Sequence, residues 1–277
     1  MIKIDQIDTE QMRRIILRQS KRANVGHIGS CLCVVEVLAA LYGRILRIPS
    51  PKHPTRDRFI LSKGHAGLAL YAALHLAGWL DAAALDTFCG DGSALGVHPE
   101  HSTPGVDFAT GSLGHGLSMA AGAALAARLD HSDRRVYCLI SDGECNVGST
   151  WEAAMFAAHH RLGNLTAIVD LNGQQAFGRT ADVMDLNNLE QRWEAFGWHC
   201  ATVDGHSVEA LEAALAAPLF SAPRMVLART VFGKGVSFME RGIPGSRNLP
   251  VQPVNWHYLP MDDEEFRIAM DELGAGR

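Results

Sequence analysis

The stretch CLISDGECNVGS, residues 138–149, decides the fold, because an apolar run stops there at two carboxylates around a glycine. Buried strands end in such turns, and in an open α/β sheet ligands bind beyond the carboxyl ends of the strands. Asp142 is therefore a candidate site residue. The alternative is a helix N-cap, a position where Asp is common. These few residues leave both interpretations open, and Glu144 is expected to be an acid at a helix start.

Four short apolar runs bounded by turn residues predict buried strands. They are residues 135–141 (RVYCLIS), 165–171 (LTAIVDL), 198–204 (WHCATVD) and 224–230 (RMVLART). Helical patterns are predicted at residues 34–46, 67–80, 116–129, 150–163, 207–218 and 262–273, with Ser207 as a candidate N-cap. Strands that alternate with helices about every 30 residues are typical of βαβ units. We therefore predict an α/β fold with a parallel sheet flanked by helices.

The composition is that of an ordinary globular protein of 277 residues, with 47% hydrophobic and 20% charged residues. The formal net charge of -5 and the lack of a basic cluster argue against nucleic-acid binding. Six cysteines without a CxxC pair or a zinc spacing predict free thiols in a reducing, cytoplasmic setting. No apolar run approaches the roughly 20 residues that span a bilayer, so no membrane association is expected.

Residues 1–277 are predicted to form a single domain, because no linker, low-complexity tract or internal repeat interrupts the pattern. Residues 240–256 are the exception. They are dense in proline and glycine and are expected to form an extended surface loop.

A second polar residue follows the next predicted strand. Asn172 lies 30 residues after Asp142, where the strand 165–171 ends. A carboxylate, an amide oxygen and a backbone carbonyl suit a divalent cation such as Mg²⁺, which fills its other positions with phosphate oxygens and water. Gly143 and the helix start beyond it would offer N–H groups to a diphosphate. The alternative is that Asp142 and Asn172 are unrelated turn residues.

The resemblance to a family rests on several motifs that occur in order along the chain. Residues 141–178 (SDGECNVGSTWEAAMFAAHHRLGNLTAIVDLNGQQAFG) look like the thiamine-diphosphate motif of the transketolase family. Further segments that resemble the family are VGHIGSCLCVVEVLAALY (25–42), RDRFILSKGHAGLALYAAL (56–74), GVHPE (96–100), GVDFATGSLGHGLSMAAG (105–122), FGWHCATVDGH (196–206), GKGVSFME (233–240) and NWH (255–257). The resemblance implies a thiamine-diphosphate-binding fold, the cofactors thiamine diphosphate and Mg²⁺, and transfer of a two-carbon ketol unit from a ketose to an aldose.

Complete transketolases have three domains in series, and this chain resembles only the first. The resemblance therefore implies the N-terminal, diphosphate-binding subunit of a split transketolase. A C-terminal partner subunit would supply the pyrimidine-binding domain, in an expected heterotetramer that acts on sugar phosphates. The helices at 116–129 and 150–163 are candidates for the interface, although core packing also explains their aliphatic faces.

The resemblance also implies a role for each matching residue. Asp142, Asn172 and the backbone carbonyl of Gln174 would hold Mg²⁺. The residues expected to contact the cofactor are Ser30, Lys63, His65, Gly111, Leu113, Gly143, Asn172 and His257. The residues expected to take part in catalysis are His27, His65, His98 and His257, because imidazoles titrate near neutral pH and suit proton transfer to and from sugar hydroxyls.

Four positions depart from the family pattern. Ser141 replaces the first glycine of Gly-Asp-Gly, and His115 replaces a glutamine. Val147 stands where the family usually has a glutamate that links two active sites, which puts that communication in doubt. Tyr258 replaces a glycine after His257. Together with residues 240–256, Tyr258 suggests a reshaped acceptor channel and a substrate other than the usual pentose phosphates.

Two other functions compete with the transketolase interpretation. One is a component of another thiamine-diphosphate enzyme, such as a 2-oxoacid dehydrogenase, although the motifs KGH, HPE and GSLG resemble transketolase more closely. The other is a non-catalytic scaffold or regulatory protein. Val147 supports a scaffold, whereas Asp142, Asn172 and the four site histidines argue against it.

Overall fold

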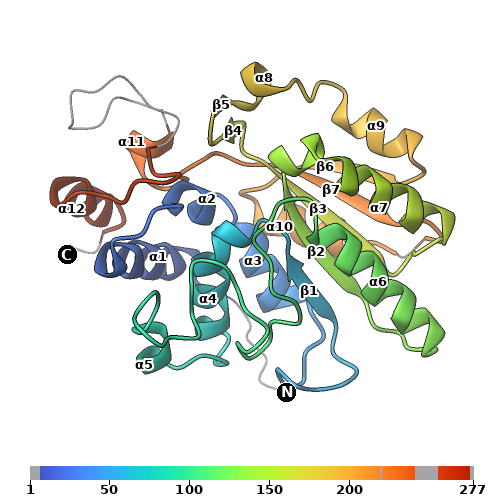
Figure 1. The fold of residues 1–277 in the computed structure, drawn as a ribbon, viewed down its shortest axis with the longest axis horizontal. Coiled ribbons are helices and arrows are strands. Elements are labelled where there is room, and N and C mark those ends of the chain that lie inside the picture. Colours follow the sequence, from blue (N-terminus) through green and yellow to red (C-terminus); the bar gives the residue numbers. More distant parts are fainter. Residues whose placement is uncertain (1–6, 219, 241–254, 275–277) are drawn as a thin grey trace.

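The structure is a computed structural model that describes residues 7–218, 220–240 and 255–274 (Figure 1). Its centre is a parallel five-stranded sheet in the order β1-β2-β3-β7-β6. The strands are β1 Arg58–Leu61, β2 Val136–Ser141, β3 Leu165–Leu171, β6 His199–Asp204 and β7 Arg224–Arg229. The four predicted strands are thus confirmed to within one residue at each end. Strand β1 was not predicted.

The middle of the sheet is buried on both faces. Every residue of β2 is buried, and β3 and β7 are buried except at their last residues. Strand β6 is at an edge and is more exposed. A short antiparallel pair, β4 Gln174–Gln175 and β5 Gly178–Arg179, follows β3 beyond the edge of the sheet. The carboxyl ends of β2 and β3 therefore open onto this pair.

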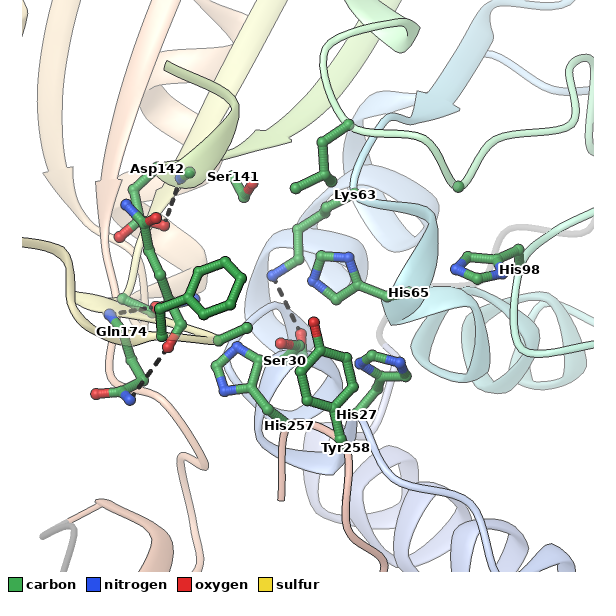
Figure 2. Close-up of a pocket in the computed structure, with 17 residues that line it drawn as sticks. His27, Ser30, Lys63, His65, His98, Ser141, Asp142, Gln174, His257 and Tyr258 are labelled. Carbon is green, nitrogen blue, oxygen red and sulfur yellow. Dashed lines mark hydrogen bonds between the residues drawn. The ribbon is translucent and has the colours of Figure 1, made fainter. Parts of the chain in front are cut away.

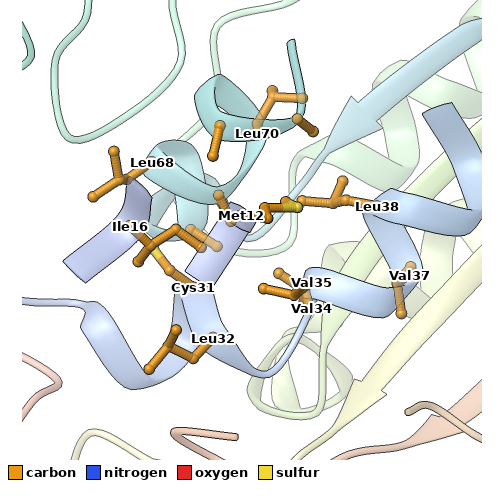
Figure 3. Close-up of a cluster of buried hydrophobic side chains, with 14 of the residues drawn as sticks. Met12, Ile16, Cys31, Leu32, Val34, Val35, Val37, Leu38, Leu68 and Leu70 are labelled. Carbon is orange, nitrogen blue, oxygen red and sulfur yellow. The ribbon is translucent and has the colours of Figure 1, made fainter. Parts of the chain in front are cut away.

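Helices cover both faces of the sheet. One hydrophobic core contains residues of α1 Thr9–Ala23, α2 Ile28–Leu32, α3 Val35–Ala40, the π-helical turn η1 Leu41–Ile45, α4 Gly67–Leu76, α10 Val208–Ala216 and α12 Asp263–Glu272. Figure 3 shows part of this core, which includes Met12, Leu38 and Leu70. A second core contains residues of α6 Gly116–Leu129, α7 Gly148–His159 and α9 Leu189–Ala195. The predicted α/β fold is therefore confirmed.

The remaining helices are short. They are the 3-10 turns η2 Gly64–Ala66 and η3 Gly143–Asn146, and the helices α5 Ala82–Leu85, α8 Thr180–Val183 and α11 Ser237–Glu240. Of these, η2 and η3 directly follow β1 and β2 along the chain, so they carry the residues that reach beyond the sheet edge.

The predicted helices are all present, and most of them have shifted ends. The pattern at 116–129 matches α6, whereas the pattern at 67–80 extends past the end of α4 at Leu76. Ser207 caps α10 as predicted, since its side chain accepts a hydrogen bond from the N–H of Ala210 at 3.1 Å. Asp262 and Glu265 form a capping box at the start of α12, which fixes that helix start.

One apolar stretch comes closer to membrane-spanning length than the sequence analysis indicated. The helical stretch Ile28–Ile45 has 18 residues and a mean hydropathy of 1.7, which is long and apolar enough to cross a membrane by length and composition. In the structure 83% of this stretch is buried inside the protein. Packing into the core therefore accounts for its composition.

Two further predictions concern domain organisation and thiols. All six cysteines are free, as the sequence predicts. The extended loop predicted at 240–256 falls almost entirely on residues 241–254, which lie outside the described residues. The single-domain prediction for residues 1–277 stays a prediction.

Candidate active site

Asp142 and Asn172 lie at neighbouring strand ends, as the sequence predicts. Strands β2 and β3 pair in parallel with Ser141 opposite Asp170, so the next residues of both strands leave the sheet at the same edge. The backbone N–H of Asp142 donates to the carbonyl of Asp170 at 3.2 Å. The two polar residues therefore face one cavity beyond the carboxyl edge of the sheet (Figure 2).

The carboxylate of Asp142 is held from two sides. Its Oδ1 accepts from the N–H of Gly143 at 2.7 Å, and its Oδ2 accepts from the hydroxyl of Thr180 at 2.5 Å. Asp142 is also the N-cap of η3, as the alternative interpretation predicts, and its role as a ligand residue stays a prediction. The N–H of Gly143, expected to contact a diphosphate, is directed at this carboxylate.

Asp142 is a buried carboxylate without a matching cation. It is 2% exposed, and among the ion pairs of the described residues it has no partner. Burial is the main cause that raises the pKa of Asp142, to about 6. A divalent cation beside it would remove this desolvation penalty, so the residue fits the predicted metal site.

The other two predicted ligands lie on the turn after β3. Asn172 Oδ1 accepts from the N–H of Gln174 at 2.9 Å, and its amide nitrogen donates to Asp170 Oδ2 at 2.8 Å. An amide oxygen has two lone pairs, so Asn172 Oδ1 retains one for a metal. The described residues contain no group of three or more His, Cys, Asp or Glu that could hold a metal. A site here would therefore rest on one carboxylate with amide and carbonyl oxygens.

Lys63 lines the cavity but its ammonium group is already paired. Its Nζ donates to Asp170 Oδ2, and both side chains are fully buried. Burial opposes the charge of Lys63, but the Asp170 carboxylate outweighs it and raises the pKa of Lys63 above its usual range. For Asp170, burial is likewise outweighed by Lys63, and the pKa is lowered. Sequence reasoning gave Asp170 no role, although an acid inside an apolar strand was a signal.

Four histidines face the same cavity. His27 precedes α2 with left-handed backbone angles (φ 60°), and its ring lies 5.3 Å from that of His65 in η2. His98 also lines the cavity, and His257 stacks on Phe232 with ring centroids 4.6 Å apart. The predicted histidine cluster is therefore formed from four separate segments.

Burial keeps two of these imidazoles neutral. It is the main cause that lowers the pKa of His27 to about 4, with a further contribution from His98. Burial and then the Lys63 charge lower the pKa of His65 well below its ordinary value. At neutral pH both rings are therefore uncharged, and each has one ring nitrogen that can accept a hydrogen bond.

The cavity brings together every site residue that the sequence predicted. Its volume is about 340 Å³. The predicted residues that line it are His27, Ser30, Lys63, His65, His98, Gly111, Leu113, Asp142, Gly143, Asn172, Gln174 and His257. The lining residues that the sequence did not predict as ligands are Ser141, Gln175, Ala176, Phe177 and Tyr258. A Cβ on Gly111 would lie 3.1 Å from the His98 ring, so the close approach of these segments favours glycine there.

Glu144 has a larger role than an acid at a helix start. It does lie in the first turn of η3, but it is fully buried. Its carboxylate accepts from the N–H groups of Gly114 and Ser141, both at 2.9 Å, and from the hydroxyl of Ser62. Burial raises its pKa. Glu144 therefore ties together the three loops that carry Lys63, Leu113 and Asp142.

Two departures from the family pattern have local explanations. A Cβ on Gly114 would lie 2.4 Å from Val147 Cγ1, so the valine packs closely against that glycine. The hydroxyl of Ser141 accepts from the N–H of Glu144 at 3.2 Å, which makes the serine a part of the same turn. The effect of Val147 on communication between sites stays a prediction.

Comparison with known proteins defines the family. Residues 4–246 match the family model described as transketolase, thiamine diphosphate binding domain. A 6-deoxy-6-sulfo-D-fructose transketolase subunit of Clostridium sp. (strain MSTE9) is 43% identical over 250 residues, which cover 88% of this chain and 90% of that protein. One of the subunits of an apulose-4-phosphate transketolase from Phocaeicola vulgatus is 37% identical, over 97% of this chain and 93% of its own length. The chain therefore belongs to the transketolase family, as its thiamine-diphosphate-binding domain.

A solved structure and a full-length sequence relative agree with this assignment. A transketolase from Campylobacter jejuni superimposes with a TM-score of 0.84 at 32% identity, over 96% of this chain and 42% of that one. Human transketolase is 39% identical over 95% of this chain and 43% of its own length. The chain thus spans less than half of these transketolases, whereas it matches the two subunit relatives over nearly their whole length.

Proposed function

We propose that this chain is the diphosphate-binding subunit of a transketolase that depends on thiamine diphosphate and Mg²⁺ and requires a C-terminal partner chain for activity. It would transfer a two-carbon ketol unit from a ketose to an aldose. One observation carries the proposal: all twelve predicted site residues line one cavity beyond the carboxyl ends of β2 and β3.

In this proposal the chain holds the anionic end of the cofactor. Asp142, Asn172 Oδ1 and the carbonyl of Gln174 would bind Mg²⁺, since hard oxygen donors suit that ion. The residues that would contact or lie near the diphosphate are Gly143, His65, His257, Ser30 and Lys63. The residues that would lie against the aminopyrimidine ring are Gly111 and Leu113. When bound, the cofactor supplies the carbon nucleophile and stabilises the negative charge of the two-carbon unit.

The histidines would handle protons at the sugar. His27, His65 and His98 would face the carbonyl and hydroxyls of the substrate, and the neutral state of His27 and His65 lets them accept hydrogen bonds from those hydroxyls. Positioned general acids and bases typically contribute about 10²–10⁴-fold to a rate. His257 would join this set from the diphosphate side.

The names of two relatives support a proposal for the partner and the substrate class. Both are named as transketolase subunits, and their names specify sugars with a sulfonate or a phosphate group. We therefore propose a ketose with an anionic terminal group as donor, such as a sugar phosphate. We further propose a cytoplasmic heterotetramer with two copies of each chain.

A native mass spectrum of the tagged chain, purified from its own cells with Mg²⁺, tests this proposal. The expected result is a complex with a second chain and one thiamine diphosphate per pair, which then converts a ketose and an aldose into new sugars. A homo-oligomer that stays free of cofactor after thiamine diphosphate is added would contradict the proposal and favour a scaffold.

A further inference from the structure

Tyr258 lies in the cavity and has no part in the proposed function. Figure 2 shows its ring between His27 and His257, and it lines the same cavity as both. The Tyr258 and His27 rings meet edge to face, with centroids 5.5 Å apart and planes at 73°. Tyr258 remains 54% exposed, so it is not a core residue that happens to reach the site. A large exposed aromatic ring in a polar cavity calls for an explanation.

The backbone that carries Tyr258 is fixed against the loop before α2. The N–H of His27 donates to the carbonyl of His257 at 2.7 Å, and a Cβ on Gly26 would lie 2.5 Å from the carbonyl carbon and oxygen of Tyr258. Trp256 has left-handed angles (φ 57°) and is 3% exposed. A bulky residue keeps such angles only where its surroundings fix them. The turn therefore cannot easily withdraw the ring from the cavity.

The ring lies against His27, where the histidine end of the cavity begins. Asp142 and Gln174 lie at the opposite side from His98 in Figure 2, and Tyr258 lies between these ends, against His27. In the proposed function the diphosphate occupies the Asp142 end, so the reacting sugar occupies the histidine end. The ring of Tyr258 thus takes up space that the rest of the sugar chain would need.

A second aromatic side chain lines the same cavity. Phe177, in the turn between β4 and β5, is 84% exposed and also lines the cavity. The cavity on this chain has a volume of about 340 Å³, and in the proposed function it has to hold the diphosphate as well. A sugar chain that extends from the histidines past Tyr258 therefore has little free room on this chain's side of the site.

We infer that Tyr258 determines the acceptor specificity of the proposed reaction, by limiting the length of the sugar aldehyde that fits against His27. This inference rests on the proposed function. A ring on a fixed backbone discriminates by overlap with longer chains, which is a repulsive form of specificity. Short, three-carbon aldehydes avoid the ring, whereas five-carbon aldoses have to displace it.

The test uses the complex of this chain with its partner, with hydroxypyruvate as donor, which delivers a two-carbon ketol unit with loss of CO₂. The kcat/KM values for D-ribose 5-phosphate and D-glyceraldehyde 3-phosphate give a five-carbon to three-carbon ratio. Tyr258→Ala is expected to raise this ratio about tenfold, mostly through a lower KM for ribose 5-phosphate. Tyr258→Phe should keep the ratio within about threefold of wild type, because the ring remains.

Leu259→Ala is the matched control, because Leu259 is on the same turn and 41% exposed but does not line the cavity. It should keep the wild-type ratio. Tyr258→Leu, with a smaller apolar side chain, should give an intermediate ratio and serves if the alanine variant does not assemble.

The outcomes separate the inference from the function on which it rests. A wild-type complex that transfers the two-carbon unit, together with an unchanged ratio in Tyr258→Ala and Tyr258→Leu, overturns the inference alone. An equal rise of the ratio in Leu259→Ala also overturns it, because the turn and not the ring would then be responsible. A wild-type complex without transfer to either aldehyde overturns the proposed function as well.

Discussion

Asp142 and Asp170 lie close together but differ in the charges around them. This difference indicates which of the two a metal ion would stabilise. Asp170 is fully buried but paired with Lys63, which lowers its pKa. Asp142 is nearly as buried without such a pair, and its pKa is raised to about 6. Burial of a carboxylate without a neighbouring cation costs folding free energy, unless a bound ligand supplies the cation. Asp142 is therefore the residue of the two that a metal ion would stabilise.

Replacement of that carboxylate tests the proposed metal site. Asp142→Asn keeps the shape of the side chain and removes its charge, so Mg²⁺ loses its anionic ligand. We expect the affinity of the complex for thiamine diphosphate, titrated calorimetrically with Mg²⁺, to fall by about 100-fold or more. The cofactor-free protein should be at least as stable as wild type, because a desolvated charge is removed.

The control for this variant is Asp182→Asn, an exposed residue on α8 that does not line the cavity. It should bind the cofactor as wild type does. Wild-type affinity in Asp142→Asn would show that Asp142 is only a helix N-cap.

At the scale of elements, a buried network around Glu36 joins four segments. Glu36 on α3 accepts from Arg13 Nη2 of α1 at 2.6 Å and bonds His206 Nδ1, after β6, at 2.9 Å. The other ring nitrogen of His206 accepts from the N–H of Val231, just after β7, at 2.8 Å. Because Nε2 accepts, Nδ1 carries the proton and donates to Glu36. The network thus holds two helices against the carboxyl ends of two strands.

Glu36→Gln should destabilise the protein and change how its stability depends on pH. The change leaves Arg13 buried without its partner, so we expect a loss of about 3 kcal/mol at pH 7. Burial opposes ionisation of Glu36, but His206 and Arg13 outweigh it and lower its pKa. Its contribution is therefore complete above its ordinary pKa of 4.5 and is lost as the pH falls through the lowered value.

Urea unfolding of both proteins between pH 7 and pH 3 measures this effect, and the difference between them should shrink toward acid. Glu10→Gln is the control, because Glu10 pairs with Arg14 at 2.9 Å but is 68% exposed. An exposed pair of this kind contributes at most about 1 kcal/mol. If Glu36→Gln were as stable as wild type at pH 7, the network would not stabilise the fold.

The sequence predicts the elements well where they are buried and continuous. Strands β2, β3, β6 and β7 are apolar runs bounded by turns, and α6 has the predicted ends. Strand β1 escaped prediction because it has only four residues and follows the charged pair Arg56 and Asp57. β1 is defined by its pairing with β2, and the paired residues are far apart in sequence.

The candidate site has the same limit, because contacts between residues far apart in sequence cannot be predicted from local patterns. Family motifs indicated twelve residues that share one cavity, because each motif has its own loop at the sheet edge. The roles of Glu144, Asp170 and Glu36 depend on partners 23 to 170 positions away, and no local pattern reveals such contacts. The backbone position of Tyr258 likewise depends on its close approach to Gly26, which is 232 positions away in the sequence.

At the scale of the whole molecule, helices α6 and α7 cover one face of the sheet and leave apolar side chains exposed on their own outer sides. Helices α6 and α7 bury small residues such as Ala124, Ala153 and Ala157 toward the sheet, which confirms core packing on their inner sides. Their outer sides carry large apolar residues, with Leu129 72%, Met155 52% and Phe156 41% exposed. An apolar outer surface on two adjacent helices suits the predicted interface with the partner chain.

Met155→Lys tests whether this surface binds the partner chain. A lysine at the centre of an apolar interface would have to lose its hydration, so the complex should dissociate in native mass spectra, and turnover should fall because the partner completes the site. The chain itself should stay folded, since Met155 is half exposed. Ala213→Lys is the control, because Ala213 is exposed on α10, and the buried residues of that helix pack into the other core. If Met155→Lys assembled as well as Ala213→Lys, the outer surface of α7 would not be the interface, and another face of the molecule would have to hold the partner over the cavity.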